Sequence, residues 1–301
     1  MTKAKERIIR PNDNEWPHYL KEIPDPPKSL HLLGLPINAG EKAVAIVGTR
    51  RPTAAGIHAA RTLAAALAQA GFAIVSGLAM GIDAVAHNAA LEVGGYTVAV
   101  MGCGISRPYP KSNLKLHERI AELGTLVSEY PSETPPQPGY FPQRNRIIAG
   151  LSAGVIVIEG GVKSGARITA ARALDYNRNV FAVPGSIRNP MAKCPNELIR
   201  NALATLITDA KHVTDDLAPG LVWSKPAEGT PTAVALDERE VDILGFLDDA
   251  PVALDVICRE KGLTFGEVAL ALSRLEVRGF VRRTVMGYEL AEGGLRARSV
   301  V

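Results

Sequence analysis

Short runs of apolar residues recur along the first two-thirds of the chain, each ended by turn residues and most of them followed by a helical segment. The runs span residues 44–47, 73–75, 97–101, 125–127, 154–158 and 180–183. Uninterrupted apolar strands are typical of a sheet that is buried on both faces, and their alternation with helices favours parallel pairing. The pattern therefore predicts an α/β domain with a mainly parallel sheet and helices on both faces.

The segments between these runs have the marks of helices. Residues 54–70 form the longest, closed by Gly71 where a left-handed residue is wanted, and residues 82–92 form another. Ligands of parallel sheets bind beyond the carboxyl ends of the strands. We therefore expect the residues that follow different strands to converge at one edge: Arg50, Ser76, Asp83, Arg146 and Lys163.

Proline and glycine divide the chain into four parts. Residues 1–40 are polar and rich in proline and are expected to strap onto the sheet domain, residues 41–217. Residues 218–234 have the composition of a linker. In residues 235–295 the pattern predicts helices at 237–247, 254–260 and 264–279 and then a hairpin, 281–285 with 288–290, which is the outline of a winged helix.

The third of these helices has few groups that could contact DNA. Its first turns read Phe265 to Leu272, and no basic residue follows until Arg274 and Arg278. We therefore favour a protein contact over reading of a DNA major groove for this small domain.

Several classes of protein are disfavoured by composition. No apolar run approaches the roughly 20 residues of a membrane span, and the charged N-terminus is unlike a signal peptide, so a cytoplasmic protein is expected. The three cysteines, Cys103, Cys194 and Cys258, are too widely spaced for a disulfide framework or a zinc knuckle. There is no Walker loop, and Gly102-x-Gly104 lacks the third glycine of a dinucleotide fingerprint. We expect no metal, no cofactor and no ATP hydrolysis.

Positive charge is concentrated in one stretch. Residues 140–178 contain six basic and two acidic residues, in a chain whose net charge is only +3. Arg144 and Arg146 flank Asn145 at the expected start of a short helix, and Lys163 to Gly165 open the next helix. The N-terminus of a helix favours anions. Two such anion-binding positions on adjacent loops therefore predict a ligand with more than one phosphate.

Five ordered motifs over residues 16–217 resemble the DprA family of DNA-processing proteins, also called Smf. They are Gly48-Thr49-Arg50, residues 76–83 with Ala86-His87, residues 141–149, Ser164-Gly165 with Thr169-Ala170, and residues 182–185. Thr49 stands where serine is commoner, and the Gly-Ala that usually follows Leu198-Ile199 is absent, which affects where the sheet domain ends.

The resemblance implies an extended Rossmann-like domain that binds single-stranded DNA, forms a homodimer and loads the RecA recombinase during natural transformation, in competence, or in related recombination. The winged helix is similar to one that many members carry. The expected DNA-binding residues are Gly48, Thr49, Arg50, Ser76, Gly77, Gly81, Phe141, Arg144, Asn145, Arg146, Lys163, Ser164, Gly165 and Thr169.

Each candidate also has a structural interpretation. Arg144 and Arg146 diverge on a helix together with Asn145, so one can bind DNA while another holds a loop; we favour DNA contacts for both. Phe141 either stacks on a base or anchors its loop. Asp83 and His87, four residues apart, are expected to fix a turn and to pack beneath it rather than act as an acid–base pair. Glu159 is expected to be tied to backbone N–H groups.

Two hypotheses of function follow. The leading one is a non-enzymatic mediator that protects single-stranded DNA and loads RecA. The alternative is a nucleotide or nucleoside-phosphate hydrolase of the lysine-decarboxylase-like Rossmann type. Such enzymes place a catalytic glutamate after the phosphate loop, and the helix after Gly165 offers only Asp175.

Overall fold

A computed structural model of the chain describes residues 6–37, 42–220, 237–247, 251–277, 280–284 and 287–291. The chain divides into two units, Met1–Trp223 and Ser224–Val301. Each unit has a core of its own.

The first unit is built on a sheet of nine strands in the order β1-β2-β6-β5-β4-β3-β7-β8-β9. All neighbouring pairs from β6 to β9 are parallel, and β1 and β2 are added antiparallel at one edge. The strands are β1 Arg7–Ile9, β2 Leu30–Gly34, β3 Ala43–Val47, β4 Ala73–Ser76, β5 Thr97–Met101, β6 Thr125–Ser128, β7 Gly154–Val157, β8 Asn179–Ala182 and β9 Thr205–Leu206.

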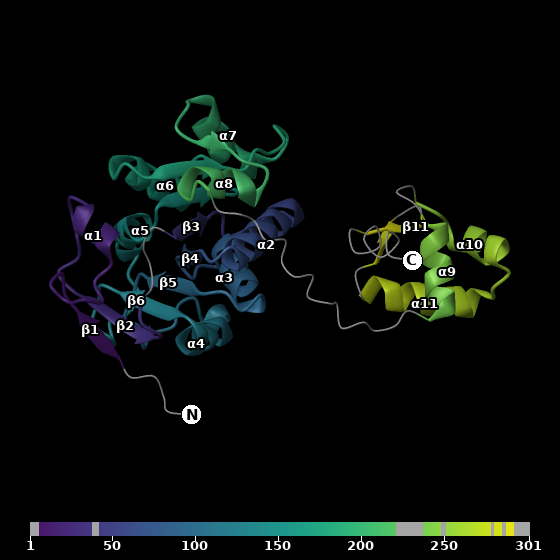
Figure 1. Ribbon diagram of the computed structural model, residues 1–301, viewed down its shortest axis with the longest axis horizontal. Helices are drawn as coiled ribbons and strands as arrows, with labels where there is room; N and C mark the ends of the chain where they lie inside the picture. Colours follow the sequence, from purple (N-terminus) through teal and green to yellow (C-terminus); the bar gives the residue numbers. More distant parts are fainter. Residues whose placement is uncertain are drawn as a thin grey trace. The chain divides into compact units, whose positions relative to one another are not determined.

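Helices cover both faces of this sheet (Figure 1). Cores shared with the strands place α1, α5, α6 and α7 on one face and α2, α3, α4 and α8 on the other. Their bounds are α1 His18–Glu22, α2 Ala54–Gln69, α3 Ile82–Glu92, α4 Leu114–Leu123, α5 Tyr140–Gly150, α6 Gly165–Asp175, α7 Lys193–Arg200 and α8 Ala210–Leu217.

Strand β3 shows why the strands are apolar without interruption. Ala43, Ala45 and Val47 pack into the core beneath α5 and α6, whereas Val44 and Ile46 pack into the core beneath α2 and α3. Successive side chains of a strand point to opposite faces, so a strand covered on both faces needs an apolar residue at every position. The predicted fold class is confirmed.

The N-terminal segment does more than strap onto the sheet. Strand β2 pairs with β6 and β1 pairs with β2, so residues 7–34 extend the sheet at its edge. Trp16, Leu20 and Ile23 are buried in the core beneath α5. The prolines between these elements break helices but leave room for two short strands.

The strand order creates a crevice at one point of the sheet. From β3 the chain runs outward through β4, β5 and β6, and then returns to place β7 on the other side of β3. At such a reversal the loops after the two central strands turn away from each other and leave space between them. The loops after β3 and β7 are those that carry Arg50 and Lys163.

The second unit has the predicted order of three helices and a hairpin. Helices α9 Glu238–Phe246, α10 Leu254–Lys261 and α11 Phe265–Val277 precede the strands β10 Val281–Thr284 and β11 Gly287–Leu290. Asp237 and Glu240 form a capping box at the start of α9, and Thr264 and Glu267 form the equivalent pair of bonds before α11. Arg278 and most of the predicted linker lie outside the described residues, so the boundaries 218–234 and 235–295 stay predictions.

None of the helices within the described ranges has the length and apolar character needed to cross a membrane.

Candidate nucleic-acid interface

A cavity of about 820 Å³ opens at the crevice of the sheet. Its walls are the segments after β3, β4, β5 and β7, parts of α5 and α6, and Met191 from the segment after β8. Ten of the expected DNA-binding residues line it: Gly48, Thr49, Arg50, Phe141, Arg144, Asn145, Lys163, Ser164, Gly165 and Thr169. Ser76, Gly77, Gly81 and Arg146 are not among the lining residues.

Exposed cations stand on the walls of the cavity. Arg50, Arg51 and Lys163 are exposed and form no ion pair within the part of the chain that the structure describes. The lining contains one carboxylate, Asp83, which is buried. The accessible charge of the cavity is therefore positive, which suits phosphate.

An aromatic ring completes the β3 side of the cavity. The ring of Phe141 is partly exposed and lies 5.3 Å from the ring of Tyr109, with 42° between their planes. The Arg50 guanidinium lies 5.9 Å from the centroid of the Phe141 ring. Apolar ring surface and a cation of the kind that suits phosphate are thus adjacent, a combination that is typical of single-strand binders.

Helix α6 begins at the cavity. Ser164 is its N-cap residue, and its hydroxyl accepts a hydrogen bond from the Ala166 N–H at 3.3 Å. Ser164, Gly165 and Ala166 all line the cavity. The first N–H groups of a helix lack partners within it, so the positive end of α6 adds to the charge of Lys163.

Arg144 is buried, and its guanidinium holds neighbouring loops together by hydrogen bonds. Helix α5 begins at Tyr140, so the expectation that Arg144 and Arg146 lie at the start of a helix is wrong; both lie beyond its first turn. The Arg144 guanidinium donates to the Gly77 carbonyl at 2.7 Å and to the carbonyl of Val100, which fixes the ends of β4 and β5. Burial lowers the pKa of Arg144 to about 10, so the group is charged at neutral pH.

Gly77 is a glycine because Arg144 passes so close to it. A Cβ at this position would lie 2.6 Å from Nη2 of Arg144. The Gly77 N–H donates to the Asp83 carboxylate at 3.1 Å, as does the Ala79 N–H at 3.4 Å. Asp83 therefore fixes the turn, as predicted. Burial raises the pKa of Asp83, and the charge of Arg144 opposes that rise.

The remaining motif residues do not line the cavity but support the loops that form it. The buried Ser76 hydroxyl donates to the Ile46 carbonyl at 2.7 Å and ties β4 to β3. Gly81 has φ +81°, and a Cβ there would lie 2.4 Å from the Thr49 carbonyl oxygen. These residues position the loop that carries Arg50, and the structure gives them no lining surface.

Arg146 points toward the N-terminal segment. Its guanidinium pairs with Glu129 at 2.6 Å and lies 3.8 Å from Asp25, and only 14% of its side chain is exposed. Asn145, between the two arginines, donates to the Gly165 carbonyl at 3.3 Å and so joins α5 to α6. The stretch from Arg144 to Arg146 thus braces three neighbouring segments.

Glu159 follows β7 and is tied to a nearby backbone N–H group, as predicted; that group lies at the start of α2, and two side chains donate to Glu159 as well. It accepts from the Thr53 N–H at 2.9 Å, from the Thr53 hydroxyl at 2.7 Å and from the Asn189 amide at 2.8 Å. A carboxylate held by three donors is a structural acceptor.

His87 is buried beneath the turn, as predicted. The Thr97 hydroxyl donates to the Ile74 carbonyl at 2.6 Å, so the hydrogen in the 2.7 Å contact with His87 Nδ1 belongs to the ring. Nε2 is buried and has no hydrogen-bond partner among the residues that the structure describes. Burial, aided by the charge of Arg144, lowers the pKa of His87 to about 3.

We expect His87 to make this unit labile to acid. An unfolded histidine takes up a proton near pH 6.5, whereas His87 in the folded protein does so only near pH 3. Between these values the unfolded state binds more protons, so the free energy of unfolding falls as the pH falls. From pH 7 to pH 5 the loss from this group is about 2 kcal/mol.

The comparison is with His87→Gln, which can still donate to Thr97 and does not titrate. Urea unfolding at pH 7 and pH 5, followed by tryptophan fluorescence, should show a smaller loss for the variant. Equal losses in the two proteins would assign the acid lability to other groups.

Comparison with known proteins matches both units. The family of DNA recombination-mediator protein A matches residues 7–218, and the DprA winged helix domain matches residues 226–285. The chain belongs to the DprA family. A relative from Escherichia coli, Protein Smf, is 36% identical over 92% of this chain and 76% of its own length. DprA from Bacillus subtilis is 43% identical over 68% of this chain and 69% of its own.

Solved DprA structures agree with the fold. DprA from Streptococcus pneumoniae superposes with a TM-score of 0.67 at 38% identity, over 70% of this chain and 74% of that one. DNA processing protein A from Helicobacter pylori gives a TM-score of 0.64 at 32% identity, over 71% of this chain and 96% of that one.

Sequence reasoning missed parts of this DprA cavity. Tyr109, Arg51 and Met191 line it, and Lys111, exposed just after Tyr109, lies at the same edge of the sheet. A Tyr-Pro-Lys sequence after the third apolar run has no recognisable motif, although its place after a strand is a usable signal. Within the described residues no cluster of His, Cys, Asp or Glu could hold a metal ion.

Proposed function

We propose that this DprA family member binds single-stranded DNA as a recombination mediator and is not an enzyme. The observation that carries the proposal is the cavity at the crevice of the sheet, which Arg50 and Lys163 both line from the loops after β3 and β7. Phosphates would be held by Arg50, Arg51, Lys163 and the start of α6. A base would stack on Phe141.

The chemistry of the cavity favours binding that depends on charge rather than on base identity. Its exposed charged groups are cations, which with the N–H groups at the start of α6 can contact phosphate, and its partly exposed ring offers a π-face that any base can use. Such a site tolerates any sequence of bases and weakens as salt is added. A duplex presents no free base face to Phe141.

A relative of known structure supports single-stranded DNA as the ligand. The H. pylori structure was described for the unique single-stranded DNA binding mode of that protein. At 32% identity over 71% of this chain, the shared fold makes the same class of ligand the natural candidate here.

The biological setting is a further part of the proposal. A homodimer would place two cavities on one strand, and loading of RecA onto that strand would make the protein a mediator in transformation or related recombination in the cytoplasm. Sedimentation of the protein at several concentrations tests the dimer. Nucleation of RecA filaments on single-stranded DNA, with and without the protein, tests the loading.

No observation favours the hydrolase hypothesis. Asp83, the one lining carboxylate, is buried and accepts two backbone N–H groups. Asp175 lies at the far end of α6 from the cavity, is exposed and pairs with Arg172 at 3.8 Å. Neither is placed to activate water in the cavity.

The proposal is tested by fluorescence-anisotropy binding to single-stranded and duplex oligonucleotides of equal length, across a salt series. We expect a preference for the single strand of at least about tenfold, since stacking of one base contributes roughly 1 to 3 kcal/mol. The slope of log K against log salt should be about −0.7 for each phosphate bound, and poly-dT and mixed sequences should bind alike. Equal affinity for duplex and single strand would contradict the proposal.

A further inference from the structure

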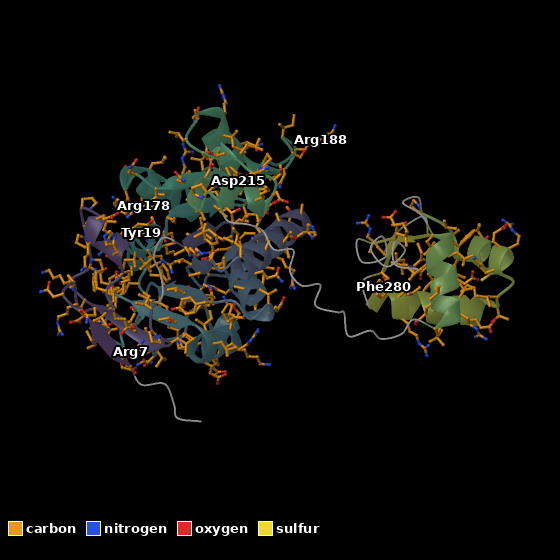
Figure 2. All side chains as sticks on the ribbon, in the orientation of Figure 1. Arg7, Tyr19, Arg178, Arg188, Asp215 and Phe280 are labelled. Carbon is orange, nitrogen blue, oxygen red and sulfur yellow. The ribbon has the colours of Figure 1, made fainter. Side chains whose placement is uncertain are left out.

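One turn at the edge of the sheet where the parallel strands have their carboxyl ends exposes an apolar side chain to solvent. It spans residues 186–189, after β8, and its tip carries Ile187 and Arg188. Ile187 is 95% exposed, more than any other large hydrophobic residue within the described ranges. Arg188 is exposed beside it, forms no ion pair with the described residues, and projects from the unit in Figure 2.

The turn is held in a defined position on both sides. Asn189 N–H donates to the Ser186 carbonyl at 2.9 Å and closes the turn. On one side, the Asn196 side chain bonds to the N–H and the carbonyl of Gly185, at 3.1 Å and 2.8 Å. On the other side, the Asn189 side chain donates to Glu159 and accepts from the Met191 N–H. The exposure of Ile187 is therefore built into the fold.

The turn is continuous with the wall of the cavity. Met191, two residues beyond the turn, lines the cavity, and its carbonyl accepts from the Gly160 N–H at 2.6 Å, in the loop that carries Lys163. Lys193 follows as a second exposed cation without an ion pair in the described chain. Exposed cations are thus found in both joined segments, Lys163 in the loop that bonds to Met191, and Arg188 and Lys193 on either side of Met191 in the chain.

We propose that the turn of Ile187 and Arg188 is a second contact site for single-stranded nucleic acid, which takes the nucleotides next to those in the cavity. Ile187 packs against a base or between two bases, and Arg188 binds the adjoining phosphate. An aliphatic tip beside an arginine matches a strand in which apolar base faces alternate with anionic phosphates. The inference rests on the proposed function and extends it by giving the strand a direction, from the cavity across the end of β8.

The test measures anisotropy binding of dT oligonucleotides about 4 and about 20 nucleotides long, which cover a cavity alone or a cavity and its surroundings. Ile187→Ser should lower the affinity for the long oligonucleotide about three- to tenfold and leave the salt slope of its binding unchanged, since the substitution removes an apolar contact. Arg188→Ala should lower the affinity for the long oligonucleotide and reduce the size of the salt slope of its binding by about 0.7, since the substitution removes one phosphate contact. Neither should affect the short one.

Two controls match these changes at the opposite edge of the sheet. Leu123→Ser alters an exposed leucine, 53% accessible, at the end of α4, and Lys42→Ala removes an exposed cation before β3. Both should bind like the parent.

Three results would overturn the inference. Parent-like binding of the long oligonucleotide by Ile187→Ser and Arg188→Ala would remove the second contact. Equal weakening of short and long oligonucleotides by Ile187→Ser would make the turn a support of the cavity. Unchanged DNA affinity with an altered sedimentation coefficient would assign the turn to a protein contact. If the parent itself binds neither oligonucleotide, the proposed function fails as well, which separates the two claims.

Discussion

The double variant Arg50→Ala/Lys163→Ala is expected to bind a single-stranded oligonucleotide about 100-fold more weakly than the parent near 0.1 M salt. A hydrogen bond to a charged group contributes about 1.5–3 kcal/mol, and the variant removes two such donors from the lining of one cavity. The salt slope should lose about 1.4 in size, about 0.7 for each released phosphate. Anisotropy across a salt series measures both quantities.

A control must remove the same charge elsewhere. Lys42→Ala/Arg61→Ala also lowers the net charge by two; Lys42 precedes β3 at the far edge of the sheet, and Arg61 lies on α2, paired with Glu92 at 2.7 Å. Its affinity should fall by less than about threefold, because distant exposed charges are screened. Similar losses in the two double variants would show that net charge, and not the cavity, attracts the DNA.

The fold could be predicted because its strands obey one local rule. Residues 44–47, 97–101 and 154–158 are apolar apart from Thr97, and the observed strands β3, β5 and β7 lie within one residue of these limits. The sequence pattern does not predict strands β1, β2 and β9. Strands β1 and β9 are the end strands of the sheet, and β2, between β1 and β6, buries Leu30 and Leu32 but leaves the rest of its residues partly exposed. In β9 both residues are exposed.

The cavity could be located from sequence, but the roles of its arginines could not. Arg50 and Lys163 each follow a strand and are found where that position predicts. Arg144 and Arg146 follow no strand, and whether they reach solvent depends on what packs against α5. Gly77 admits the guanidinium of Arg144, and Glu129 with Asp25 holds that of Arg146. These partners lie 17 to 121 residues away in the chain, beyond any local pattern.

Arg144→Met should be the most destabilising of the substitutions considered for the first unit, at about 3–5 kcal/mol. Methionine fills much of the same volume but leaves the Gly77 and Val100 carbonyls without their donor and the buried Asp83 carboxylate without a compensating charge. Urea unfolding followed by tryptophan fluorescence reports this unit, since Trp16 is buried in its core.

Arg167→Met is the matched control for this prediction. Arg167 is 47% exposed on α6 and pairs with Glu197 at 2.8 Å, so its loss should cost less than about 1 kcal/mol. Single-strand affinity, measured in the absence of urea, separates the two roles that the sequence left open for Arg144. A variant that unfolds like the parent but no longer binds DNA would make Arg144 a DNA contact. A lower free energy of unfolding, together with near-parent affinity for single-stranded DNA in the fraction that remains folded, would make Arg144 a structural residue that supports the cavity.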